Sequence, residues 1–243
     1  TSIKILDGLV ESGVDMIELG MPFSDPMADG PAIQAASLRA IRSGMTLKGS
    51  LEIAAQFREK HKDVPLILMG YYNPIYRFGV EAFLSEAKAA GADGLIIVDL
   101  PPEEDVELCD PSLQAGIDFI RLITPTTLGD RLPFVLEKAS GFIYYVSIAG
   151  ITGTKSAHLE TIASAVGRIK HVSELPVVTG FGIRTPEQAA TVASVGDGAI
   201  VGSAVVEIIA DASANNLSSD ETAKKVARFA KSLSVAIAKQ TSN

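Results

Sequence analysis

The sequence lacks three features that would mark whole classes of protein. It has a single cysteine, Cys109, so no disulfide forms within the chain, which favours a reducing compartment such as the cytoplasm. It has no basic excess, because 21 Lys+Arg stand against 29 Asp+Glu and give a formal net charge of −8. Such a charge provides no electrostatic footprint for nucleic acid or an anionic membrane. It also has no apolar run near the roughly 18–20 residues that span a bilayer, and no signal-peptide pattern at its start. We therefore predict a cytoplasmic protein that binds neither nucleic acid nor membrane.

The sequence does contain enough apolar residues for one large core, since they make up 47% of its 243 residues. A pattern of helix, glycine, aspartate and apolar strand recurs, as in Gly91-Ala92-Asp93 before residues 94–98 and Gly116-Ile117-Asp118 before residues 119–120. Each glycine can adopt the left-handed conformation that ends a helix, and each apolar run has the length of a strand. The pattern predicts seven strands that start near residues 15, 65, 93, 118, 142, 176 and 197.

Amphipathic stretches lie between these strands, for example residues 80–90 and 159–169, and the first interval holds two helices over 31–44 and 47–60. Strands that alternate with helices pair in parallel, so we predict an α/β fold, a (β/α)8 TIM barrel forming a single domain over residues 1–243. The chain opens inside a helix, so the first strand of a closed barrel is apparently missing and we expect the domain to be N-terminally incomplete. An open doubly wound sheet is the alternative fold.

The first visible strand carries an acidic residue. Alternation along Met16-Ile17-Glu18-Leu19-Gly20 places Glu18 on the inward face, near the carboxyl end of the strand, where barrel enzymes hold catalytic groups. A carboxyl group that is desolvated there gains a raised pKa and becomes a proton donor near neutral pH. A structural carboxylate with an unidentified partner is the alternative interpretation.

The loop over residues 22–31 holds three prolines and two further carboxylates, Asp25 and Asp29. Asp29 precedes Gly30-Pro31 and could cap the next helix, and Asp25-Pro26 could form an ordinary turn. Composition alone favours these two interpretations. Prolines would also stiffen a loop that holds an acid over the mouth of a barrel.

Glycine-rich turns follow the last two predicted strands. Residues 180–183, Gly-Phe-Gly-Ile, precede one helix, and Gly202-Ser203 opens the next. Loops at this place form the phosphate site of the barrel architecture, because glycine lets backbone N–H groups reach the oxygens and the helix dipole favours the charge. Tight strand-to-helix turns are the alternative. A third glycine-rich stretch, residues 147–155, is either a mobile lid or a plain connection.

The run from Ile17 to Pro31, IELGMPFSDPMADGP, resembles the signature of the tryptophan synthase alpha subunit family without a mismatch. The resemblance extends over about the whole chain. It implies cleavage of indole-3-glycerol phosphate to indole and glyceraldehyde 3-phosphate, a retro-aldol lyase reaction of tryptophan biosynthesis. It also implies an α2β2 heterotetramer with a beta subunit that holds pyridoxal phosphate, with no cofactor in this subunit.

The resemblance assigns roles to individual residues. Glu18 is the general acid/base, and Asp29 accepts a hydrogen bond from the indole N–H. Neither a Schiff-base route nor a metal site is expected, since no predicted strand contains lysine and the three histidines are scattered. The other expected residues bind substrate or support the site: Tyr144, Gly153, Phe181, Gly182, Gly202, Ser203 and Met69 in substrate binding, and Tyr71, Asn73 and Asp99 in support.

Two rival functions use the same features. Another phosphate-binding barrel, such as a sugar-phosphate or phosphoribosyl isomerase, would share the glycine turns but has no reason to keep the run from residue 18 to residue 31. A catalytically silent scaffold subunit has no need of both Glu18 and Asp29. An assay of indole release separates these possibilities.

Overall fold

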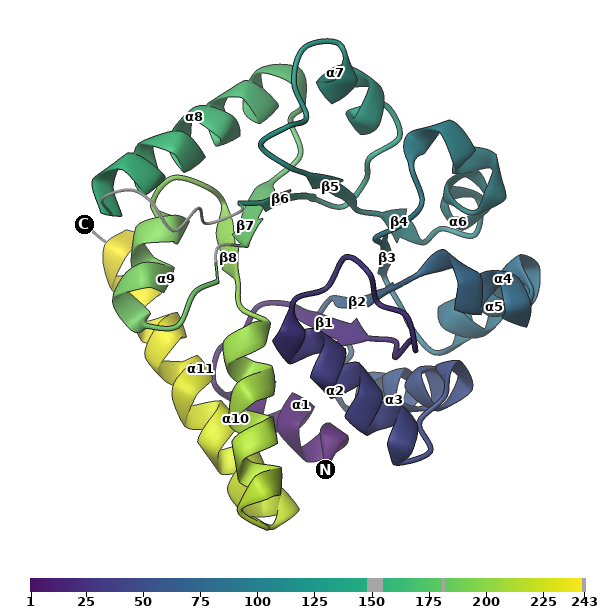
Figure 1. Ribbon diagram of the computed structural model, residues 1–243, viewed down its shortest axis with the longest axis vertical. Coiled ribbons are helices and arrows are strands. Elements are labelled where there is room, and N and C mark those ends of the chain that lie inside the picture. Colours follow the sequence, from purple (N-terminus) through teal and green to yellow (C-terminus); the bar gives the residue numbers. More distant parts are fainter. Residues whose placement is uncertain (148–154, 181, 242–243) are drawn as a thin grey trace. The chain divides into compact units, whose positions relative to one another are not determined.

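The protein is described by a computed structural model over residues 1–147, 155–180 and 182–241. The chain divides into two compact units, which we describe one at a time. Unit 1 comprises residues 1–119 and 205–230, and unit 2 comprises residues 120–204 and 231–243. Each unit contains a four-stranded, wholly parallel sheet with helices beside it (Figure 1).

In unit 1 the strands are ordered β1-β2-β3-β4. Its elements are α1 (Ser2–Glu11), β1 (Ile17–Gly20), α2 (Pro31–Arg42), α3 (Leu47–Lys60), β2 (Leu66–Gly70), α4 (Tyr72–Phe78), α5 (Val80–Ala89), β3 (Gly94–Ile97), the 3-10 helix η1 (Pro102–Glu107), α6 (Cys109–Gln114) and β4 (Asp118–Phe119), together with most of α10 (Ser203–Ala214) and the first half of α11 (Ser219–Thr241).

In unit 2 the strands are ordered β5-β6-β7-β8. Its elements are β5 (Arg121–Ile123), α7 (Arg131–Leu136), β6 (Ile143–Val146), α8 (Lys155–Val172), β7 (Val177–Gly180), α9 (Pro186–Ala193) and β8 (Gly198–Ile200), together with the remaining parts of α10 and α11.

All seven predicted strand positions are confirmed, each within about two residues of its expected start. The fourth predicted strand is interrupted at Ile120, so it forms two short strands, β4 and β5. The predicted helices over residues 31–44, 47–60 and 80–90 are also confirmed as α2, α3 and α5. Within each sheet, at least one helix lies between successive strands, which explains the parallel pairing.

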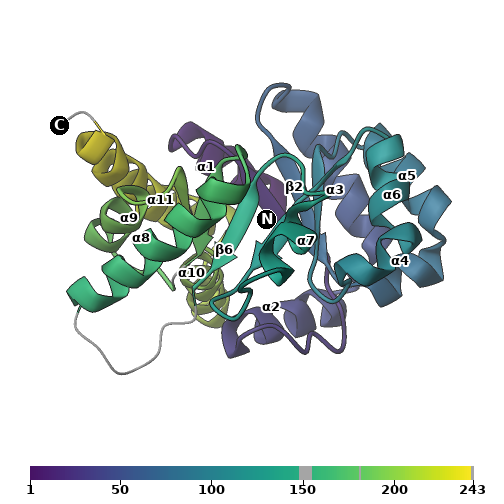
Figure 2. The same cartoon turned by 90° about the horizontal axis from the view of Figure 1, so that it is seen from above.

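The sheet of unit 1 has one face buried under helices. Phe57 of α3 and Phe83 of α5 are at most 1% exposed, and Figure 2 shows α3, α4, α5 and α6 grouped beside this sheet. Each fully buried aliphatic side chain contributes roughly 1.5–3 kcal/mol to folding. The strand residues in this core are Ile17, Leu19, Leu66, Leu68, Leu95, Ile97 and Phe119. Because side chains alternate along a strand, the residues between them project from the opposite face.

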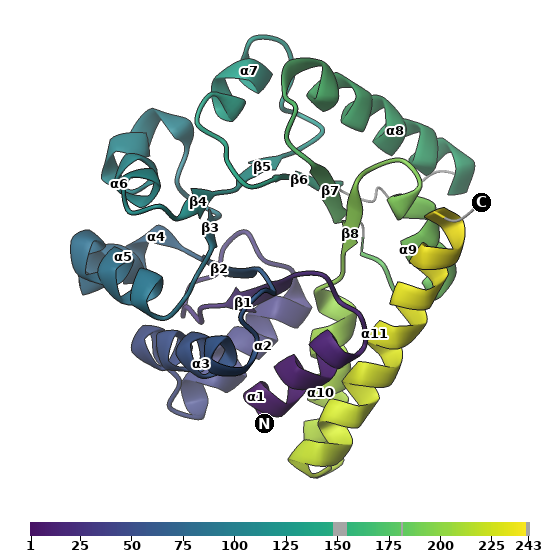
Figure 3. The same ribbon diagram turned by 180° about the vertical axis from the view of Figure 1, so that it is seen from behind.

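The N-terminal helix α1 packs within unit 1 against α10 and α11 (Figure 3). Gly8 allows this close approach, since a Cβ atom there would lie 3.3 Å from the Cβ of Ala227. The Ser12 hydroxyl donates to the carbonyl of Ala227 at 2.8 Å, and the Lys4 ammonium pairs with Asp220 at 2.8 Å. The helix predicted for the first residues of the sequence is confirmed as α1.

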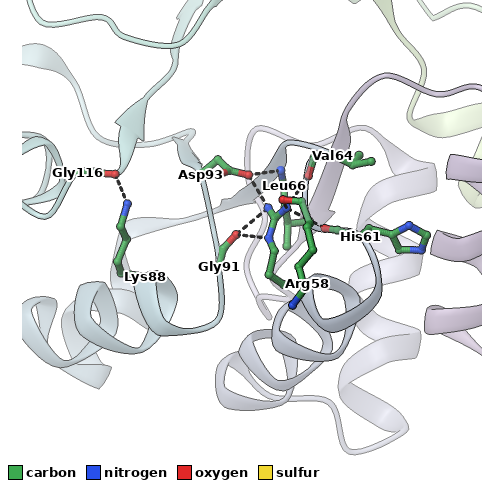
Figure 4. A network of polar contacts seen from close by, with 9 residues as sticks. Arg58, His61, Val64, Leu66, Lys88, Gly91, Asp93 and Gly116 are labelled. Atoms are coloured by element: carbon green, nitrogen blue, oxygen red, sulfur yellow. Dashed lines mark hydrogen bonds and ion pairs between the residues drawn. The ribbon is translucent and has the colours of Figure 1, made fainter.

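At the amino ends of β2 and β3, Arg58 is the centre of a polar network (Figure 4). Its guanidinium donates to the carbonyls of Gly91, His61 and Val64, and it pairs with Asp93 at 2.6 Å. The same carboxylate oxygen of Asp93, Oδ2, also accepts from the amide of Leu66 at 2.8 Å. The aspartate of the repeated pattern therefore links a strand start to the preceding helix, at the end of the sheet away from the predicted site.

The same arrangement recurs in unit 2. The Asp197 carboxylate accepts from the amide of Val177 at 2.7 Å and pairs with Lys170 of α8 at 2.7 Å. Gly196, however, has no positive φ, so the left-handed conformation expected of each repeat glycine is wrong at this copy. Its Cβ would lie 3.0 Å from the carbonyl oxygen of Val177, so close backbone approach is the reason for glycine there.

Candidate active site

Strand β1 places Glu18 on the face of its sheet that the helices do not cover. Ile17 and Leu19 enter the helix-covered core, and Glu18 projects the other way beside its register partner Ile67. This confirms the predicted alternation. Met69, one pleat further along, pairs with Gly20 and projects from the same face.

Glu18 occupies an exposed position of β1, so a small molecule can reach its carboxyl group. Desolvation by the protein around this group, followed by the nearby negative charge of Asp29, raises its pKa from 4.5 to about 7. Glu18 can therefore hold and release a proton near neutral pH.

The loop that follows β1 is fastened to α2. The Ser37 hydroxyl donates to the carbonyl of Phe23 at 2.7 Å and accepts from the amide of Phe23 at 2.8 Å. Next to it, the Ser24 hydroxyl donates to Asp25 at 2.5 Å and the Met27 amide donates to the Asp25 carbonyl at 2.8 Å. The turn interpretation of Asp25 is confirmed. Sequence reasoning missed Ser37, because a serine within a helix gives no signal of a contact fourteen residues away.

Asp29 does not cap the next helix. Helix α2 starts after Gly30, and its N-terminus has no side-chain cap. The capping interpretation of Asp29 is therefore wrong. Its backbone carbonyl accepts from Gln34 at 2.8 Å, and its carboxylate hydrogen-bonds with the hydroxyl of Tyr71. Burial raises the pKa of Asp29, and the Tyr71 hydrogen bond acts in the opposite direction.

The residues that follow β2 and β3 support this loop. Tyr71 is 4% exposed, its ring lies 5.5 Å from that of Phe23, and its hydroxyl accepts from the amide of Ala28 at 3.1 Å. Asp99 accepts from the amide of Tyr72 at 2.8 Å, at the start of α4. Unit 1 thus brings Glu18, Asp29, Tyr71 and Asp99 together at the carboxyl ends of its strands. Asn73 is exposed on the first turn of α4, apart from this cluster of contacts.

In unit 2, Tyr144 lies over a glycine. A Cβ at Gly180 would lie 2.7 Å from the Tyr144 ring and hydroxyl, so a side chain there would displace the tyrosine. Tyr144 pairs in register with Val178, and Gly198 of β8 pairs with the same residue. Tyr144 is thus the second residue of β6, on the face opposite the fully buried Tyr145, and its ring reaches Gly180 at the carboxyl end of β7.

The glycine turns of unit 2 also end at the carboxyl edge of its sheet. Gly182 has a φ of 59°. Both Gly182 and Gly202 are exposed, and none of the described residues has an atom within 4 Å of a Cβ position at either glycine. The N-terminus of α9 is satisfied by a capping box between Thr185 and Gln188, so that helix end offers fewer free amides than the sequence suggested. Ser203 is the first residue of α10. Phe181, Gly153 and most of the predicted lid lie outside the described residues.

Two kinds of feature are absent from the part of the chain that the structure describes. None of its helices is both long and apolar enough to cross a membrane. Within the same residues, no group of three or more His, Cys, Asp or Glu side chains is placed to hold a metal ion, and no strand contains a lysine.

Residues 1–238 match the tryptophan synthase alpha chain family. The chain belongs to this family. The tryptophan synthase alpha reaction cleaves indole-3-glycerol phosphate to indole and glyceraldehyde 3-phosphate in tryptophan biosynthesis, and this is the lyase activity of the chain. The predicted family, function and (β/α)8 TIM-barrel class are confirmed.

Solved tryptophan synthase structures agree with this assignment. The chain is 39% identical to tryptophan synthase subunit alpha from Legionella pneumophila strain Paris, with a TM-score of 0.89 over 98% of this chain and 87% of that one. It is 34% identical to a chain of the tryptophan synthase complex from Pyrococcus furiosus, with a TM-score of 0.83 over 96% and 90%. It is also 34% identical to a chain of M. tuberculosis tryptophan synthase in an open form with BRD0059 bound, with a TM-score of 0.83 over 97% and 86%.

Proposed function

We propose that Glu18 and Asp29 perform the acid–base chemistry of the alpha reaction. Glu18 in its protonated form donates to C3 of the indole, which turns the glycerol side chain into a leaving group. The resulting carboxylate then takes the proton of the adjacent glycerol hydroxyl as the carbon–carbon bond breaks, so the proton count balances. Asp29 accepts from the indole N–H and stabilises the positive charge that develops on the ring. Each role contributes about 10²–10⁴-fold to the rate.

The observation that supports this division of roles is the pair of unlike carboxyl environments in unit 1. Glu18 has a pKa of about 7, and its causes include the charge of Asp29. Asp29 has a hydrogen-bond donor, the Tyr71 hydroxyl, which favours its ionised form. Burial raises the pKa of both carboxyl groups, and only at Asp29 does a hydrogen bond from Tyr71 offset part of that rise. Two carboxyl groups in unlike environments are the usual arrangement for an acid and a base that act on one substrate.

We also propose that residues 1–243 act as one catalytic domain and that unit 2 supplies the substrate phosphate site. Gly182, Gly202 and Ser203 offer backbone amides at the carboxyl edge of a parallel sheet, where barrel enzymes bind phosphate. Several charge-assisted hydrogen bonds of roughly 1.5–3 kcal/mol each offset the repulsion from the net charge of −8. Gly153 is a further proposed phosphate contact. Tyr144, Met69 and Phe181 are proposed to contact the indole, with Asn73 and Asp99 in supporting positions.

A beta subunit is the proposed partner, in an α2β2 complex like the one described for the Pyrococcus furiosus enzyme. Large apolar side chains are exposed on three segments of unit 1: Met27 of the loop after β1 at 75%, Tyr76 of α4 at 65% and Val106 of η1 at 71%. These segments follow β1, β2 and β3, so the chain enters all three from the carboxyl edge of one parallel sheet. Such a group of exposed apolar side chains is typical of an interaction surface. Pyridoxal phosphate is proposed to reside in that partner, and the chain is proposed to work without a cofactor of its own, in the cytoplasm.

The acid–base roles are tested by indole release from indole-3-glycerol phosphate with the full chain, alone and with a beta subunit. We expect Glu18→Gln and Asp29→Asn each to lower turnover by at least about a hundredfold. Asp25→Asn is the matched control, since Asp25 lies in the same loop and only completes a turn. Near-normal turnover in either variant would refute the role of that residue.

The interaction surface is tested separately by binding of a beta subunit. We expect Met27→Ser combined with Val106→Ser to weaken the complex, whereas Leu38→Ser, at an apolar residue 45% exposed on α2, leaves it unchanged. Equal affinity of all three proteins would remove this surface from the proposal.

A further inference from the structure

Tyr71 holds its hydroxyl in a fixed position beside Asp29. Its ring is 4% exposed and packs 5.5 Å from the ring of Phe23, so the side chain has little freedom. The hydroxyl accepts from the amide of Ala28 at 3.1 Å and hydrogen-bonds with the carboxylate of Asp29.

These two contacts fix the direction of the Tyr71 hydrogen bond. A phenol has one hydrogen to donate and lone pairs to accept with. Because the amide of Ala28 already occupies a lone pair, the hydroxyl hydrogen is available to Asp29. Burial and the acidic neighbours raise the pKa of Tyr71 to about 12, so the hydroxyl remains a donor throughout the range in which an enzyme is assayed.

Charged groups reach this cluster from three elements of unit 1. Glu18 comes from β1, Asp29 from the loop after it, and Asp99 from the residues after β3. All three are acids, and burial disfavours the charged form of both Glu18 and Asp29. Two neighbouring acids in such a setting titrate as a coupled pair, and the proton goes to the member whose charge is less well stabilised.

We propose that Tyr71 is a positioning residue that determines which acid carries the proton: by donating to Asp29, it keeps the proton on Glu18. The inference rests on the proposed roles of Glu18 and Asp29 and adds the cause of their difference. Without the hydroxyl, Asp29 competes for the proton. In the form that carries the proton on Asp29, no negative charge faces the indole ring and Glu18 has no proton to donate.

The test is the pH profile of kcat/KM for indole release by Tyr71→Phe, which keeps the packed ring and removes only the hydroxyl. The acid limb reports Asp29, which must be ionised, and the basic limb reports Glu18, which must be protonated. We expect the midpoint of the acid limb to rise by about one pH unit in the variant, which is a tenfold change in the proton affinity of Asp29. The midpoint of the basic limb is expected to stay unchanged.

Tyr72→Phe provides a matched control. Its hydroxyl also donates to a carboxylate, that of Glu107 at 2.7 Å, and burial and Glu107 raise its pKa to about 12 as well, but Glu107 belongs to η1 and not to the acid pair. We expect the Tyr72→Phe profile to match the wild type. A shift of the same size in both variants would mean that loss of any tyrosine hydroxyl in this region perturbs the enzyme, and it would overturn the proposal.

A second measurement keeps the inference testable if Tyr71→Phe is too unstable to assay. The carboxyl carbon of Asp29 can be titrated by ¹³C NMR in the labelled full chain at low temperature, and we expect its pKa to be higher in Tyr71→Phe than in wild type. An unchanged value overturns the inference. An active Glu18→Gln variant would instead overturn the proposed function, so the two failures are distinguishable.

Discussion

The replacement Glu18→Gln tests function and energetics in one variant. Glutamine keeps the size and polarity of the side chain and removes the proton that the reaction needs. We expect turnover to fall by at least about a hundredfold, with the affinity for a phosphate-bearing analogue nearly unchanged, because the proposed phosphate contacts lie on other residues.

The same variant is expected to be more stable than the wild type in alkaline solution. The folded state raises the Glu18 pKa from 4.5 to about 7. The unfolded chain therefore releases this proton near pH 4.5, whereas the folded chain keeps it until about pH 7, so ionisation costs the folded state stability as pH rises through this window. Full burial would make this cost about 3 kcal/mol, and we reduce it to about 1–2 kcal/mol because the side chain is partly open to solvent.

Urea denaturation at a series of pH values measures this effect. We expect the free energies of unfolding of wild type and Glu18→Gln to agree near pH 4 and to differ by about 1–2 kcal/mol, in favour of the variant, above pH 7. Asp25→Asn serves as the control for loss of a charge in the same region. A constant difference across the pH range would refute the raised proton affinity of Glu18, whatever the turnover.

Three further predictions concern unit 2 and the network in unit 1. Gly182→Val places a β-branched residue at a φ of 59°, so we expect a higher KM for indole-3-glycerol phosphate with a smaller change in kcat; an unchanged KM in steady-state kinetics would reject the phosphate assignment. Thr179→Val removes a fully buried hydroxyl that has no hydrogen-bond partner among the described residues, so we expect a gain of about 1 kcal/mol in urea denaturation, and a loss would reveal a partner for the hydroxyl. Arg58→Met removes the donor for several carbonyls and for Asp93, so we expect a loss of about 2–4 kcal/mol, whereas an unshifted urea midpoint would contradict the structural role of the network.

The strands and most long helices could be predicted because their signals are local. The apolar run 66–69 after Pro65 and the amphipathic stretch 47–60 each fix an element without any distant contact. The short helices α4, α6 and α7 were not predicted, because six or seven residues give too little periodicity. The break at Ile120 has no local signal either.

The sequence was enough to predict which residues form the candidate site, but it predicted only some of the contacts between them. Alternation along β1 was enough to place Glu18, since the period of a strand is two. The environment of Asp29 could not be predicted, because Asp-Gly-Pro is a good capping sequence. Only the structure shows the carboxylate beside Tyr71, forty-two residues away. Composition favoured a helix-capping role for Asp29, whereas in the structure its carboxylate makes a long-range hydrogen bond with Tyr71.

The role of the repeated aspartates was likewise hidden from the sequence. The pattern that ends in Asp93 and Asp197 predicted where strands start. It did not predict that each carboxylate joins the first amide of a neighbouring strand to a cation of the preceding helix, because the partners Arg58 and Lys170 lie about thirty residues away.

The most direct test is the titration of the Glu18 carboxyl carbon by ¹³C NMR in the labelled full chain, compared with the same chain carrying Asp29→Asn. We predict a midpoint near pH 7 that moves to lower pH when the charge of Asp29 is removed. A midpoint near 4.5 in the wild type, or one that ignores the Asp29 substitution, would contradict the coupled acid pair on which the proposed chemistry depends.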